Sequence, residues 1–302
     1  MKLGIVVVYL VKDEDEELLR VHLDQIERST TVPYTIYAGV NRLQPGFRRM
    51  LEAHKKVKIC QLPKTDLRIS EEHAFYLEHL FGQAISDGVS HVAVLHVDSF
   101  PVRSGWAKEL AEKLSDRCVF AAVRRDEARD LKPNLMCILF PRDYYLAQRP
   151  RLTLSAAEKG SDEYASYSRK FPHVNETGVG YGLQTYRKGL TWYPLVRSNR
   201  AQDHYLIGSI YGDLIFHLGA AARPDKLFNL DRLSLTGGDQ PSFAARSLGF
   251  IASLLPEVIK SRVRQRLLKA KEAENLAIYE KVRSKLFADP QAYLRYLRYG
   301  GK

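Results

Sequence analysis

Short apolar runs alternate with helical patterns through the first 125 residues of this chain, and no other feature limits its possible folds as strongly. The opening run, Leu3 to Leu10, is apolar throughout, which is typical of a strand buried on both faces of a parallel sheet. Acidic residues from Asp13 to Glu17 then favour the start of a helix, because carboxylates stabilise the positive end of the helix dipole. Apolar spacing carries that helix to about Arg28.

The alternation continues along the chain. We expect further strands at Tyr34 to Val40, Val57 to Cys60, His91 to Asp98, Cys118 to Val123 and Leu135 to Phe140, and helices at Glu71 to Ser86 and Gly105 to Leu114. Residues 150–180 are polar and lack periodicity, so we expect a long loop there, followed by a helix at Tyr181 to Lys188 and strands at Trp192 to Val196 and Asp213 to Leu218. This order indicates βαβ units on a mostly parallel sheet, an α/β fold of the doubly wound, nucleotide-binding type.

Charge is distributed unevenly along the 302 residues. The net charge is +11, and residues 251–302 contribute +7 of it, from 12 Lys or Arg and 5 Asp or Glu. Apolar residues recur there at three- and four-residue spacing, which predicts basic amphipathic helices. Three roles are open for this segment: packing on the rest of the protein or on a second copy, contact with an anionic membrane, and nucleic-acid binding, which lacks a recognised motif.

Missing sequence signatures count against a kinase-like protein, a Rossmann dehydrogenase and an α/β-hydrolase. The chain has no P-loop, no G-x-G-x-x-G after the first strand, no H-E-x-x-H and no G-x-S-x-G. Its three cysteines form no C-x-x-C pair, so we expect buried free thiols rather than a zinc or redox site. No apolar run reaches the roughly 18 to 20 residues that cross a bilayer, and we expect a cytoplasmic protein.

The most informative segment is HVAVLHVDSFPVRSGW, from His91 to Trp106. On a strand, His96 and Asp98 share one face, and Asp98 lies at the carboxyl end, where open α/β sheets bind ligands. A carboxylate in that place commonly meets a divalent cation, because hard cations bind oxygen. The alternative is an Asp that caps the following turn.

This pattern resembles the nucleotide-sugar-dependent glycosyltransferases of the GT-A fold, most closely the family 2-like group. The resemblance covers residues 3 to 220 and rests on the first strand, the helix with Glu72, His73 and Gly82, the strand ending VLHVDSFP, and Gly105-Trp106. In that family the strand ends in an Asp-x-Asp motif that holds Mn²⁺ or Mg²⁺ against the donor diphosphate. Here Asp98, Ser99 and Phe100 occupy the motif, so the second Asp is replaced by Phe.

The resemblance also implies site residues elsewhere. His217, followed by Gly219, looks like the late His of these enzymes and would be a second metal ligand with Asp98. Glu176 in NETG resembles their catalytic base, with Asp203 as runner-up. A core role for His217 and a solvated loop position for Glu176 are the alternatives. The implied donor-binding residues are Val8, Tyr9, Leu10, Asn41, Arg42, His73, His96, Asp98 and Ser99.

The resemblance implies a GT-A catalytic domain at 1–222, with a donor-binding half at about 1–125 and an acceptor-binding half at about 126–222. A connector at 223–250 and the basic helical appendage at 251–302 follow. The implied enzyme (EC 2.4 class) transfers a sugar from a nucleoside diphosphate sugar to a saccharide or glycolipid, with inversion and a divalent metal, in cell-envelope polysaccharide synthesis. We expect it in the cytoplasm, at the inner face of the membrane if the acceptor is lipid-linked, with the appendage as a membrane or homodimer contact. An inactive binding or scaffold subunit and a sugar nucleotidyltransferase remain alternatives.

Overall fold

The computed structural model describes residues 1–9, 16–40, 43–173, 177–204, 206–219 and 276–300. It divides into two compact units. The first comprises Met1–Asn199 and Ile210–His217, and the second Arg200–Ser209 and Leu218–Lys302. No described helix combines the length and the hydropathy that a transmembrane segment needs.

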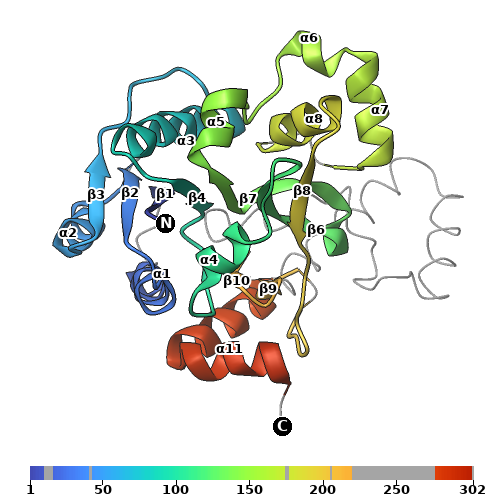
Figure 1. Ribbon diagram of the computed structural model, residues 1–302. Coiled ribbons are helices and arrows are strands. Elements are labelled where there is room, and N and C mark those ends of the chain that lie inside the picture. The colour runs from blue at the N-terminus through green and yellow to red at the C-terminus, as the bar shows by residue number, and fades with distance from the viewer. Residues whose placement is uncertain (10–15, 41–42, 174–176, 205, 220–275, 301–302) are drawn as a thin grey trace, which may run out of the picture. The chain divides into compact units, whose positions relative to one another are not determined.

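A seven-stranded sheet forms the centre of the first unit (Figure 1). Its strands are β1 (Leu3–Tyr9), β2 (Tyr34–Val40), β3 (Val57–Cys60), β4 (His91–Leu95), β6 (Cys118–Arg125), β7 (Asp130–Pro141) and β8 (Thr191–Leu195). They lie in the order β3-β2-β1-β4-β7-β6-β8, and only β7 runs antiparallel to its neighbours. The predicted α/β class with a mostly parallel sheet is confirmed.

Helices cover both faces of this sheet. On one face, α1 (Glu16–Ser29), α2 (Pro45–Ala53) and α4 (Trp106–Ala111) bury residues such as Ile26, Leu51 and Trp106 against Ile5 and Val7 of β1. On the other, α3 (Ile69–Ser86), α5 (Arg142–Gln148) and α8 (Val179–Arg187) pack around Val6, Val92 and Phe140. Every β1 residue except Val8 is buried, as its uninterrupted apolar sequence predicts.

The strand predicted at His91 to Asp98 is shorter than expected. β4 ends at Leu95, and residues 96–98 form a turn that leads into β5 (Ser99–Pro101). β5 pairs antiparallel with β10 (Ile215–His217). Together with β9 (Ser209–Tyr211), these strands form a second, three-stranded sheet in the order β5-β10-β9. The prediction that His96 and Asp98 share a strand face was therefore wrong, because the Ser99 side chain accepts the His96 backbone N–H and closes the turn.

The long loop predicted at 150–180 was also wrong, because this stretch contains α6 (Ala156–Lys159) and α7 (Asp162–Lys170). Both begin at a serine cap, and Ser155 forms a capping box with Glu158. Such short amphipathic helices leave little periodicity to detect. The helix predicted at Gly105 to Leu114 is the shorter α4.

The second unit contains two helices among its described residues. Residues 276–288 and α11 (Pro290–Tyr299) are helices, and both pack on the segment Arg200–Ser209. Tyr279, Leu286 and Leu297 are buried there. The connector at 223–250 and the helix expected around 254–267 lie outside the described residues.

Candidate metal centre

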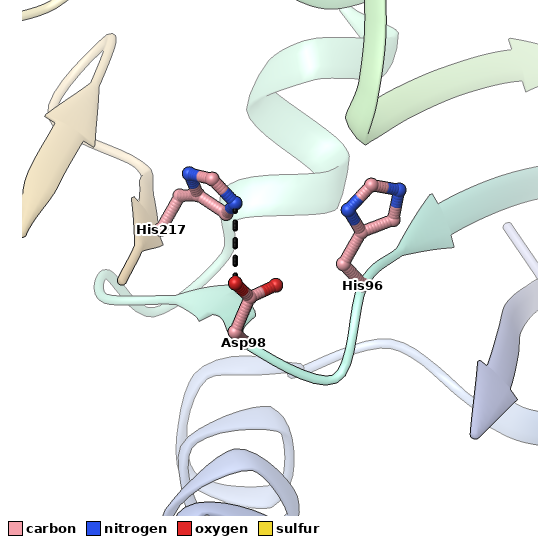
Figure 2. A group of neighbouring side chains, drawn as sticks. All are labelled: His96, Asp98 and His217. Carbon is pink, nitrogen blue, oxygen red and sulfur yellow. Dashed lines mark ion pairs between the residues drawn. The ribbon is translucent and has the colours of Figure 1, made fainter. Parts of the chain in front are cut away.

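Three side chains meet at the carboxyl end of β4: His96 and Asp98, which are close in sequence, and the distant His217 (Figure 2). The first two lie on the turn after β4, and His217 arrives on β10. The register of β10 on β5 pairs His217 with Ser99, which places the imidazole beside the preceding Asp98. Pairing of β5 with β10 therefore brings His217, which lies far along the chain, to the turn that follows β4.

The geometry of the cluster is compact. The Nε2 atom of His217 lies 3.4 Å from Oδ2 of Asp98, and one ligand atom from each of the three residues lies within 4.8 Å of the others. The side chains of His217 and Asp98 are 8% and 9% exposed. Figure 2 shows one ring nitrogen of His96 turned toward the other two residues. His96 Nε2 and His217 Nδ1 are buried without a hydrogen-bond partner.

Ser99 fixes the turn that carries two of these side chains. Its Oγ accepts the backbone N–H of His96 at 2.8 Å and donates to the carbonyl of Met136 on β7 at 2.5 Å. Its own backbone N–H donates to the carbonyl of His96 at 3.0 Å. Ser99 is completely buried, so these bonds do not compete with water.

A second hydrogen-bonded chain reaches the same turn from α1. His22 is completely buried and lies between the Tyr9 hydroxyl, 3.1 Å from its Nε2, and the Ser99 carbonyl, 3.0 Å from its Nδ1. The carbonyl can only accept, so Nδ1 carries the proton and Nε2 accepts from Tyr9. The end of β1, α1 and the turn are thus connected by buried polar groups.

Burial lowers the pKa of three histidines around the turn: His22, His73 and His96. Desolvation lowers the pKa of His96 to about 4, opposed by the charge of Asp98. It lowers the pKa of His22 to about 4 and that of His73 to about 3. The His73 ring meets the His96 ring edge-on, with centroids 5.4 Å apart. Neutral imidazoles have a free lone pair, which is the form that binds metal ions.

The structure places the predicted donor-binding residues in different settings. His73, His96, Asp98 and Ser99 gather at the turn, whereas Tyr9 directs its hydroxyl to His22 and is completely buried. Val8 is partly buried at the end of β1. Leu10, Asn41 and Arg42 lie outside the described residues, as does the candidate base Glu176.

Asp203, the runner-up base, belongs to the second unit and is surrounded by cations there. Its carboxylate accepts from Lys285 Nζ at 2.6 Å and lies 3.5 Å from Lys281 Nζ. Burial alone would raise the pKa of Asp203, but the hydrogen bond from Lys285 and the two lysine charges lower it below its ordinary value. The carboxylate is an ion-pair partner of the helix at 276–288.

Phe100 takes no part in the cluster. It is completely buried in β5 and stacks on Phe216 of β10, with ring centroids 4.9 Å apart. The candidate ligands on the turn are therefore His96 and Asp98, in the spacing His-x-Asp, rather than Asp98 and Phe100.

Sequence reasoning missed two groups near this edge of the sheet. His22 gave a weak signal, a histidine within the apolar stripe of the first helix. Glu127 follows β6, and its side chain is 9% exposed, with one oxygen accepting from Tyr211 at 2.7 Å and the other buried without a partner. Glu127 gave no signal in the sequence, because its partner Tyr211 comes from a distant strand.

Comparison with known proteins gives similarities only at the level of solved structures. No family model and no curated protein matches the chain. TarS of S. aureus (residues 1–349) matches with a TM-score of 0.38 and 10% identity over 53% of each chain. The mannosyltransferase PcManGT from Pyrobaculum calidifontis, solved with GDP-Man and Mn²⁺, matches with a TM-score of 0.35 and 12% identity, over 48% of this chain and 46% of its own. The galactosyltransferase LgtC, solved with donor and acceptor sugar analogues, matches with a TM-score of 0.38 and 10% identity, over 64% and 73%. The chain thus spans about half the length of the first two.

The cluster has the donor set of a metal centre. Two imidazoles and one carboxylate can ligate a divalent cation and leave further positions open for oxygen atoms of a substrate. Without a cation, the same groups form a buried Asp98–His217 pair with a neighbouring His96.

Proposed function

We propose that this chain is a glycosyltransferase that transfers a sugar from a nucleoside diphosphate sugar to a saccharide or glycolipid acceptor. The observation that carries the proposal is the position of the His96, Asp98 and His217 cluster. The chain places β2 and β3 on one side of β1 and β4 on the other, so the strand order reverses between β1 and β4. Open α/β sheets bind ligands outside the carboxyl strand ends at such a reversal, and the cluster follows β4.

Asp98 and His217 would hold a divalent cation, Mn²⁺ or Mg²⁺. Such an ion, when bound, neutralises the charge that develops on a departing diphosphate. The turn fixed by Ser99 holds Asp98 in place, and the β5–β10 pairing does the same for His217. Protein groups that are already ordered need no rearrangement when charge develops, which favours the transition state.

The helix that carries His73 also borders a cavity. A cavity of about 250 Å³ opens at the amino end of α3, lined by Arg68, Ile69, Ser70, Glu71, Thr153, Leu154 and Lys159. His73, which contacts His96, lies on the first turns of the same helix. Arg68 and Lys159 offer donors for sugar hydroxyls or for an anionic group of the acceptor.

The finer parts of the proposal come from the sequence. Inversion needs a carboxylate that removes the acceptor hydroxyl proton, and Glu176 is the candidate, with Asp203 as runner-up. A lipid-linked acceptor of cell-envelope polysaccharide synthesis would place the enzyme at the cytoplasmic membrane face, where the basic residues of 251–302 would contact anionic lipid.

A donor panel tests the proposal. Turnover of UDP-, GDP-, dTDP- and CMP-sugars, with and without Mn²⁺, should identify at least one donor that is hydrolysed or transferred. Asp98→Asn should reduce that turnover at least about a hundredfold, the scale on which metal-centre residues act. The control is Asp126→Asn, which removes an exposed carboxylate that pairs with Arg124. No binding and no turnover of any donor would favour the scaffold alternative.

A further inference from the structure

We infer that the cavity at the amino end of α3 binds the anionic group of an acidic saccharide, a sugar that carries a carboxylate or a phosphate. The inference deepens the proposed function, on which it rests for the role of that saccharide as the acceptor. Binding itself can be measured without any sugar donor, so the two proposals are tested separately.

Two segments that are far apart in the sequence line the cavity. Residues 68–71 include the first turn of α3, and Thr153, Leu154 and Lys159 belong to the stretch that leads into α6 and forms it. The second segment lies within residues 126–222, the half of the predicted domain for which the family resemblance implies acceptor binding. The volume of about 250 Å³ is just below the roughly 300 to 1,000 Å³ of sites for drug-sized ligands, so it suits a group as small as one sugar ring.

Positive charge is in excess in the lining. Arg68 and Lys159 contribute two cations, whereas Glu71 contributes one carboxylate. Both cationic side chains are exposed, and neither forms an ion pair within the part of the chain that the structure describes. Arg68 donates to the backbone carbonyl of Leu67 at 3.2 Å, which leaves its charge unopposed.

The acidic residue next to Lys159 is engaged elsewhere. Glu158 accepts hydrogen bonds from the backbone N–H and the hydroxyl of Ser155, both at 2.8 Å, and lies 3.3 Å from the guanidinium of Arg187. These contacts hold the Glu158 carboxylate in the capping box of α6. The charge of Lys159 is therefore available to an anion.

The rest of the lining suits a sugar that carries the anion. Ser70 and Thr153 add hydroxyl groups, and neither hydroxyl has a hydrogen-bond partner among the described residues. Ile69 and Leu154 provide apolar surface. The Ile69 side chain is 64% exposed, and its backbone φ of 52° lies in the left-handed region, which is unusual for a β-branched residue. Strained backbone of this kind clusters at ligand-binding sites.

An anionic sugar uses this lining more fully than a neutral one. A guanidinium group binds a carboxylate or a phosphate through two parallel hydrogen bonds, and an ammonium group adds a point charge. Hydrogen bonds with an ionised partner are about twice as strong as those between neutral groups. A neutral sugar would leave both cations without a counter-charge.

Saturation-transfer NMR on the full-length protein tests the inference. Glucuronate and glucose 6-phosphate are compared with neutral glucose, and inorganic phosphate serves as the probe of the anion alone. We expect at least one acidic sugar to bind at least about tenfold more tightly than glucose and than inorganic phosphate, and the sugar that does so identifies the anionic group.

Variants of the lining assign that binding to the cavity. Arg68→Gln and Lys159→Gln should each weaken binding of the acidic sugar at least about tenfold, because each removes one charge-assisted contact. Both side chains are exposed, so the variants should fold like the wild type. Glu71→Gln removes the opposing carboxylate and should strengthen the binding.

The matched controls remove the same charges on the other face of the sheet. Arg48→Gln in α2 and Lys108→Gln in α4 each lose a cation that pairs with a glutamate one turn along the helix, and their affinities should equal that of the wild type. Equal binding of acidic and neutral sugars, no sugar binding, inorganic phosphate binding as tight as that of the acidic sugar, or unchanged binding in Arg68→Gln and Lys159→Gln would each overturn the inference. Selective binding of an acidic sugar without turnover of any donor would contradict the proposed function and leave the cavity's ligand class standing.

Discussion

Ser99 is the residue on which the geometry of the candidate site depends most. Its hydroxyl joins the start of the turn, at His96, to Met136 of the neighbouring β7, and its carbonyl accepts from His22. Ser99 itself need not touch a ligand, because its contacts set where the Asp98 and His96 side chains lie. A residue expected from the family resemblance to bind the donor thus has a positioning role in the structure.

Replacement of Ser99 tests that role. In Ser99→Ala, the backbone N–H of His96 loses its acceptor inside the protein, and the free energy of unfolding should fall by about 1 to 3 kcal/mol. Urea denaturation measures this, and Mn²⁺ affinity should fall in parallel. Ser115→Ala is the control, since Ser115 accepts an exposed backbone N–H from Cys118. Equal stability of the two variants would contradict the role of Ser99.

The buried His22 gives the protein a predictable pH dependence. Burial lowers its pKa to about 4, below the ordinary 6.5. Between these two pH values the unfolded state therefore binds a proton at His22 and the folded state does not. Stability present above pH 6.5 is therefore lost as the pH falls toward 4, by about 3 kcal/mol from this residue. His22→Gln keeps a polar side chain but removes the titration, so its stability should fall less steeply over that interval. Urea denaturation from pH 4 to 7 measures both slopes, and identical slopes would show that His22 titrates normally.

At the scale of elements, the sequence predicted most strands and little of their pairing. β2 and β3 end where the apolar runs end, because both are bounded by polar residues. The end of β4 could not be predicted, since no Gly or Pro interrupts HVAVLHVD after Leu95 and the break depends on the contact of Ser99 with Met136. His217 was singled out by the resemblance, but its meeting with Asp98 depends on the β5–β10 register, which no local pattern encodes.

Two glycines test how tightly the elements pack. A Cβ at Gly180 in α8 would lie 2.2 Å from the Arg151 carbonyl oxygen, a backbone atom that cannot move aside alone. Gly180→Ala should therefore lower the free energy of unfolding by about 1 to 3 kcal/mol. Gly82 in α3 has open space around the same position, so Gly82→Ala should be neutral or stabilise by up to about 1 kcal/mol. Thermal unfolding compares them, and a neutral Gly180→Ala would contradict the packing of α8.

At the scale of the whole molecule, the charge of +11 belongs to a chain with two units of different character. The first carries the candidate metal centre, and the second contains the basic segment 251–302. In the described part of that segment, one side of each helix is buried: Tyr279 and Leu286 in 276–288, and Leu294 and Leu297 in α11. Burial thus accounts for this part of the apolar stripe. Contact with a membrane or a second copy stays a prediction.

Replacement of Asp203 distinguishes a structural role of this carboxylate from a catalytic one. Asp203→Asn removes the charge that Lys285 and Lys281 meet, so the free energy of unfolding should fall by about 1 to 3 kcal/mol. Turnover of the sugar donor should remain within about threefold of the wild type, because the carboxylate is committed to the two lysines. Denaturation and donor turnover are measured on the same preparation. A stable but inactive variant would instead make Asp203 the base.

The central claim is that Asp98 and His217 hold a cation against the diphosphate of a donor. Paramagnetic broadening of the ³¹P resonances of a bound nucleoside diphosphate by Mn²⁺ tests it most directly, because the effect requires metal and phosphate in one site. We predict strong broadening in the wild type and its loss in Asp98→Asn, with Asp126→Asn unchanged. Broadening that persists in Asp98→Asn, or binding of the diphosphate without any effect of Mn²⁺, would contradict the account.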